Sequence, residues 1–137
     1  MNIERYKLRP YAHQLECLSK FGQHEYFALL AEMGTGKTFI IVNNIAQLWA
    51  AGELNGALIL APNGVHLAWQ NIELAKSMPE WVRWESAAWK SNPNKKEKAS
   101  IDALFGSKDS TQLRIFAMNW EALQSERGFA AAKQFCL

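Results

Sequence analysis

The residues with the clearest chemistry are the eight from Ala31 to Thr38, which read Ala-Glu-Met-Gly-Thr-Gly-Lys-Thr. The two glycines allow left-handed backbone conformations and close approach to a ligand. Backbone N–H groups of such a loop, and of a helix that follows it, can cradle a phosphate, to which Lys37 adds a positive charge. The Thr38 hydroxyl is suited to Mg²⁺. The octet therefore predicts a nucleotide-phosphate site, and the alternative is a chance Gly-Lys-Thr at a helix start.

Two flanking segments are needed to position this loop. The apolar run Tyr26–Leu30 predicts a strand, and residues 37–51 predict a helix with one apolar stripe, which Gly52 ends. Ala31 stands where the general phosphate-loop pattern has its first glycine. Because Gly34 and Gly36 remain, a small residue at position 31 is compatible with the same loop.

Strands and helices alternate along the rest of the sequence. The run Ala57–Ala61 is apolar without alternation, as in a central parallel strand covered on both faces, and Pro62-Asn63-Gly64 ends it. We expect further helices at residues 11–21, 65–77, 99–105 and 129–137, strands at 81–89 and 113–118, and a short helix at 120–123 that Asn119 caps. This alternation predicts an α/β fold, a parallel sheet flanked by helices. Ligands bind such sheets where the strands end, so the octet, residues 62–64 and residues 119–120 should converge.

Composition excludes several classes of protein. With 137 residues, 49% hydrophobic and 20% charged, the chain is one domain or a piece of one and not a disordered tail. A net charge of +2 does not by itself indicate a nucleic-acid partner. Cys17 and Cys136 have no metal-ligand spacing, and the sequence has no signal region and no membrane-length apolar segment. We expect a cytoplasmic protein of bacterial or phage-like origin without a membrane partner.

Four segments, taken in order, resemble the first motor domain of superfamily-two helicases, in particular the Swi/Snf-like branch. The octet is similar to that family's first motif, Ala-x-x-Gly-x-Gly-Lys-Thr, in which Ala in place of the first Gly is usual. The resemblance implies a RecA-like P-loop NTPase domain with ATP and Mg²⁺ as cofactors. It implies that the nucleotide is bound by Met33, Gly34, Thr35, Gly36, Lys37 and Thr38, with Lys37 and Thr38 serving catalysis and Thr38 ligating Mg²⁺.

The segment Leu8-Arg9-Pro10-Tyr11-Ala12-His13-Gln14 resembles the adenine-reading Q motif of the family. An amide side chain offers one donor and one acceptor, which match N6–H₂ and N7 of adenine. The resemblance thus implies that Gln14 binds the adenine and that Tyr11 is a candidate for stacking on it. Gln14 lies four positions after Pro10, where the Snf-like branch usually has two. The alternative is a solvated helix face with a core tyrosine.

Two later segments resemble motifs that hold a nucleic-acid backbone. Leu58–Pro62, followed by Trp69, is similar to motif Ia at the Snf-like spacing, although Glu73 comes one position later than the acidic residue of that branch. Residues 119–123, Asn-Trp-Glu-Ala-Leu, are similar to motif Ib. The alternative for the first segment is an ordinary strand-to-helix turn with Trp69 in the core. The resemblance implies nucleic-acid contacts at Asn63, Gly64, His66, Asn119 and Trp120.

Two parts of such a motor have no counterpart in the sequence. No Asp-Glu-x-x segment, which in the family holds Mg²⁺ and positions the attacking water, follows a predicted strand. A second RecA-like domain with its arginine fingers is also missing. We therefore expect residues 1–137 to be the N-terminal part of a first RecA-like domain, incomplete at its C-terminus, with the second motor domain elsewhere in the same parent chain. By itself this piece should bind ATP without useful hydrolysis.

The expected function is that of the ATP-binding part of an ATP-dependent DNA translocase or helicase of the Snf-like branch. An RNA helicase or a restriction-enzyme motor subunit is the alternative within the superfamily. A non-motor nucleotide-binding module, such as a small-molecule kinase or an ATP-sensing domain, is the alternative from another class. The sequence does not decide between DNA and RNA, or between unwinding and translocation.

Overall fold

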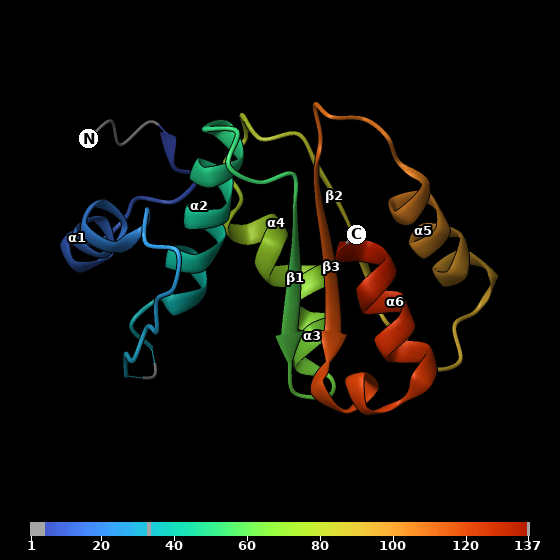
Figure 1. Ribbon diagram of the computed structural model, residues 1–137. Helices are drawn as coiled ribbons and strands as arrows, with labels where there is room; N and C mark the ends of the chain where they lie inside the picture. The colour runs from blue at the N-terminus through green and yellow to red at the C-terminus, as the bar shows by residue number, and fades with distance from the viewer. Residues whose placement is uncertain (1–4, 33, 137) are drawn as a thin grey trace.

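The structure, a computed structural model, describes residues 5–32 and 34–136. At its centre lies a parallel sheet with the strand order β1-β3-β2. The strands are β1 (Gly56–Ala61), β2 (Trp84–Ala88) and β3 (Leu113–Asn119). Because all of them run in the same direction, their carboxyl ends meet at one edge of the sheet, at the bottom of Figure 1.

A hydrophobic core lies on each face of the sheet, and β3 contributes side chains to both. Successive side chains of a strand point to opposite faces, so Leu113 and Ile115 enter one core while Phe116 and Met118 enter the other. All four side chains are fully buried. The strand that is covered on both faces is therefore β3. The sequence assigned that central place to Ala57–Ala61, but within the described residues β1 pairs only with β3 and lies at the sheet edge.

Helices cover both faces of the sheet (Figure 1). One layer holds α2 (Lys37–Ala50) and a helical run made of α3 (Val65–Ala68), η2 (Trp69–Glu73) and α4 (Leu74–Ser77). The other layer holds α5 (Lys95–Gly106) and α6 (Glu126–Cys136), with the short helix η3 (Trp120–Gln124) after β3. A further helix, α1 (Ala12–Phe21), packs on α2 through a small core that contains Leu18 and Phe39. The predicted α/β fold with a parallel sheet flanked by helices is confirmed.

The predicted strand at Tyr26–Leu30 is wrong. The segment is extended but has no strand partner among the described residues, and the side chains of Tyr26 and Leu30 are 85% and 96% exposed. Leu29 alone of its side chains packs against a core, the one between α1 and α2. An apolar run has strand propensity, but a strand forms only where a neighbour supplies the ladder hydrogen bonds.

Two local expectations also need correction. Asn119 occupies the N-cap position of η3, but its side chain does not cap the helix and donates instead to the Glu121 carboxylate, 3.1 Å away. α5 begins four residues earlier than predicted, at Lys95. The reason is a capping box, in which Asn94 Oδ1 accepts from the Glu97 backbone N–H and the Glu97 carboxylate accepts from the Asn94 N–H.

The predicted helix at residues 65–77 is confirmed, but its middle is wound more loosely than an α-helix. At η2 the Leu74 N–H donates to the Trp69 carbonyl, a bond that spans five residues. Nowhere in the described residues is a helix long and apolar enough to cross a membrane.

Gly128 in α6 offers a test of how closely that helix packs on η3. A Cβ at this position would collide with the Ala122 carbonyl, whereas a Cβ on Gly106 of α5 would meet nothing within 4 Å. We expect Gly128→Ala to lower the free energy of unfolding by about 1–3 kcal/mol through overpacking. The measurement is urea unfolding followed by circular dichroism. Gly106→Ala is the control and should change stability by less than about 0.5 kcal/mol. Equal effects of the two substitutions would contradict the packing of α6 on η3.

Candidate functional site

The glycine-rich loop has the backbone that its sequence predicts. Gly34 and Gly36 have φ angles of 78° and 79°, a left-handed conformation that side chains disfavour. Gly36 is the N-cap of α2 and, like any glycine, supplies no side-chain cap bond. The N–H groups of the first turn of a helix have no carbonyl partner within the helix. Those of α2 therefore face the loop as donors for an anion.

α1 holds this loop in place through two side chains. Gln14 is 4% exposed, and its Nε2 donates to the Gly36 carbonyl over 3.3 Å while its Oε1 accepts from the Tyr11 N–H over 2.7 Å. His13 Nε2 lies 2.8 Å from the Thr35 carbonyl. Because a carbonyl only accepts, that nitrogen of His13 carries the proton. The segment that resembles the Q motif thus sits directly against the glycine-rich loop.

A hollow of about 600 Å³ lies beside the glycine-rich loop. Its charged lining is mostly positive, with Arg9, Lys37 and Lys76 against the single carboxylate of Glu73. The Lys37 ammonium donates to the Ala31 carbonyl over 3.0 Å and has no carboxylate partner among the described residues. We call this hollow the loop cavity, and its charge suits a polyphosphate.

The loop cavity brings together most of the residues predicted to bind a nucleotide. Those that line it are Gln14, Gly34, Gly36, Lys37 and Thr38. Thr35 supports the loop by donating its hydroxyl to the Glu32 carbonyl over 2.7 Å. Met33 lies outside the described residues. The Gln14 amide retains one N–H and one lone pair beyond its internal bonds. Tyr11 is 69% exposed and also lines the cavity.

The donor set fits ATP with Mg²⁺. Three cations and the first turn of α2 surround this space. It opens beside the exposed ring of Tyr11 and the Gln14 amide, which still has hydrogen-bonding capacity. Within the described residues, no group of three or more His, Cys, Asp or Glu side chains could hold a metal ion alone. A magnesium ion would therefore be held by the Thr38 hydroxyl together with phosphate oxygens.

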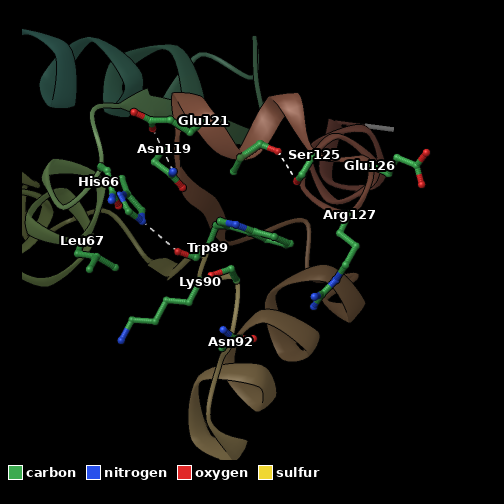
Figure 2. Close-up of a pocket in the computed structure, with 13 residues that line it drawn as sticks. His66, Leu67, Trp89, Lys90, Asn92, Asn119, Glu121, Ser125, Glu126 and Arg127 are labelled. Carbon is green, nitrogen blue, oxygen red and sulfur yellow. Dashed lines mark hydrogen bonds between the residues drawn. The ribbon is translucent and has the colours of Figure 1, made fainter.

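A second cavity, of about 740 Å³, lies where the strands end (Figure 2). Its walls come from the segments that follow β1, β2 and β3, and from the start of α6. We call it the strand-end cavity. Of the residues predicted to contact nucleic acid, Asn63, His66 and Asn119 line it. Gly64 forms the turn beside it with a φ of 85°, and Trp120 is 54% exposed but is not part of the lining.

His66 is buried in this wall with 3% of its surface exposed. Its Nε2 lies 3.0 Å from the Trp89 carbonyl, and its Nδ1 is buried without a partner among the described residues. The Glu121 backbone N–H and the Asn119 amide hold the pKa of the Glu121 carboxyl below its ordinary value. The wall thus combines an unsatisfied ring nitrogen with a carboxylate.

Several residues of the strand-end cavity were missed from the sequence. They are Trp89, Lys90, Asn92 and Arg127. The first three directly follow β2, so the rule that ligands bind where parallel strands end would have found them if applied to residues 81–89. Lys90 is paired with Glu97 at 2.6 Å, and this hydrogen bond is the main cause of the lowered pKa of the Glu97 carboxyl.

Comparison with known proteins gives one match. A protein-family model described as type III restriction enzyme, res subunit, matches residues 6–134, a range that includes both cavities. No curated protein matches the chain, and no solved structure does.

Gly36 and Gln14 provide a test of how the loop is held. A Cβ on Gly36 would collide with the Gln14 amide, whereas one on Gly34 would meet nothing within 4 Å. Both positions have positive φ, so each alanine costs about 1–2 kcal/mol of backbone strain. We expect Gly36→Ala to lower the free energy of unfolding more than Gly34→Ala does, by about 1 kcal/mol for each Gln14 hydrogen bond that it breaks.

The measurement is urea unfolding of a double-mutant cycle. Once Gln14→Ala has removed the amide, Gly36→Ala should cost no more than Gly34→Ala does. Strict additivity of Gln14→Ala and Gly36→Ala would show that Gln14 does not hold the loop.

Proposed function

Because the chain belongs to the family of type III restriction enzyme res subunits, which have the N-terminal domain of a superfamily-two helicase, we propose that it is the ATP-binding part of an ATP-dependent DNA motor. In this proposal residues 1–137 form part of a first RecA-like domain, and the second motor domain belongs to the same parent chain. The observation that carries the proposal is the loop cavity, where two left-handed glycines, an uncapped helix start and three cations meet.

Each residue of the loop cavity has a role in this proposal. Lys37 neutralises charge on the β- and γ-phosphates, and the N–H groups that open α2 bind their oxygens. Thr38 ligates Mg²⁺, which when bound supplies charge neutralisation for phosphoryl transfer. Gln14 uses its remaining N–H and lone pair on the adenine, next to the exposed ring of Tyr11.

The family match supports the restriction-type motor over the other candidates from the same superfamily. The Snf-like branch rests only on the Met33-Gly34 pair and on the interval between Pro62 and Trp69. A small-molecule kinase has no support from the family match. The strand-end cavity supports a nucleic-acid partner, since its amides and the turn at Gly64 can donate to a phosphate backbone.

The first test is nucleotide binding by the chain. We expect a fluorescent ATP analogue with Mg²⁺ to bind, and Lys37→Ala to weaken that binding by about tenfold or more, since charge-assisted bonds to phosphate are strong. Binding is read by fluorescence anisotropy. Lys20→Ala is the matched control, because Lys20 is an exposed lysine paired with Glu16, and it should leave the affinity unchanged. Equal affinity of the Lys37→Ala variant and the wild type would refute the assignment of the loop cavity.

The second test is turnover. We expect the chain to release no phosphate from ATP above background, with or without single-stranded or duplex DNA. The reason is that no Asp-Glu-x-x segment is present to position the attacking water. Steady-state phosphate release measures this, and clear turnover that disappears in Lys37→Ala would contradict it.

A further inference from the structure

We propose that the strand-end cavity receives an unstacked nucleobase of a single strand, which stacks on the indole of Trp89. The inference rests on the proposed function, because it specifies how the nucleic-acid partner is held. It goes beyond that function because backbone contacts alone need no aromatic ring.

The position of Trp89 is fixed from both sides. Its backbone N–H donates to the Ala117 carbonyl of β3 over 2.8 Å, and its carbonyl accepts from His66 Nε2 over 3.0 Å. The indole is half-buried, with part of its surface against the core beneath α5 and α6. Figure 2 shows the ring in the middle of the strand-end cavity. A rigid, partly exposed indole in an open hollow is a stacking platform for a base.

The groups around the ring can satisfy the edge of a base. The side-chain amides of Asn92 and Asn119 line the same cavity as the indole (Figure 2), and each offers a donor and an acceptor. His66 is buried and contributes in another way, because its Nε2 lies 3.0 Å from the Trp89 carbonyl and so fixes the backbone that carries the indole.

The charges favour a base over a phosphate as the main ligand here. Leaving His66 aside, Lys90 and Arg127 in the lining are matched by Glu121 and Glu126. Lys90 is further engaged by Glu97 at 2.6 Å. The loop cavity, by contrast, has three cations and one carboxylate. Attraction of phosphate groups alone therefore gives the strand-end cavity little affinity for a nucleic-acid strand. Stacking of a base on the exposed surface of the indole provides the additional affinity.

The space continues beyond the ring. A neighbouring cavity of about 410 Å³ toward α5 shares Trp89, Lys90, Ser91, Asn92 and Arg127 with the first. A strand that places one base on Trp89 thus has room for the adjoining nucleotide, with Arg127 accessible from both hollows. A duplex with paired and stacked bases would not present a free base face to the ring.

The experiment compares two labelled strands that carry the same phosphates. One is oligothymidylate of about 12 nucleotides and the other is an abasic strand of equal length, both titrated with the chain at low salt. Fluorescence anisotropy should give about tenfold tighter binding of the oligothymidylate. Trp89→Leu should reduce its affinity to that of the abasic strand and leave abasic binding unchanged. Trp81→Leu is the matched control, since Trp81 is 41% exposed and precedes β2, and it should keep the tenfold ratio.

A second variant controls for loss of the fold in Trp89→Leu. Trp89→Phe keeps an aromatic ring in the core, and unlabelled oligothymidylate should quench tryptophan fluorescence in the wild type but not in this variant. Comparing oligodeoxyuridylate with oligouridylate shows which backbone the site prefers, because the base is the same in both.

Three results would count against the proposals. If the wild type binds the abasic strand as tightly as oligothymidylate, or if Trp89→Leu weakens both equally, base stacking is wrong and the DNA function stands. If the wild type binds no nucleic acid, the proposed function fails together with the inference.

Discussion

The parallel pairing of β1 and β2 with β3 is the constraint on which the candidate sites depend. The register sets Ala61 opposite Asn119, and Ala88 opposite Ala117, so the segments after the strands emerge at one edge. β3 can hold this place because it buries apolar side chains on both faces. Its pairing also reaches the strand-end cavity directly, since the Trp89 N–H bonds to Ala117. A shift in this register would move the indole out of the cavity.

The two cavities differ in the kind of ligand chemistry they offer. The loop cavity gains its character from backbone geometry and from three cations that face a single carboxylate. The strand-end cavity has balanced charge but offers a flat ring and side-chain amides. α4 adds Lys76 to the first, and α3, in the same helical run, adds His66 to the second. The 65–77 run therefore connects the two hollows physically.

Local sequence patterns predicted most of the helices and strands. The signals used, which are apolar stripes of helices, glycines at helix ends and apolar runs, each involve only residues that are close in sequence. The octet, α2 and the 65–77 helix belong to this group. The strand at Tyr26–Leu30 failed because pairing depends on a neighbour that the run itself does not specify. Arg127 could not be found from its surroundings in sequence, since only the turn of η3 into α6 brings it beside Trp89. Gln14 was predicted near the nucleotide, but its bond to the Gly36 carbonyl emerged only with the packing of α1, whereas its bond to the Tyr11 N–H is local to the start of that helix.

The loosely wound turn at η2 has a consequence for how such a chain tolerates change. A turn closed over five residues holds one residue more than an α-helical turn, as the Leu74-to-Trp69 bond does here. A turn of this kind accommodates the additional residue, while the residues after it keep their direction around the helix axis. Lys76 lies after this turn and lines the loop cavity, so its direction toward the glycine-rich loop depends on the width of the turn.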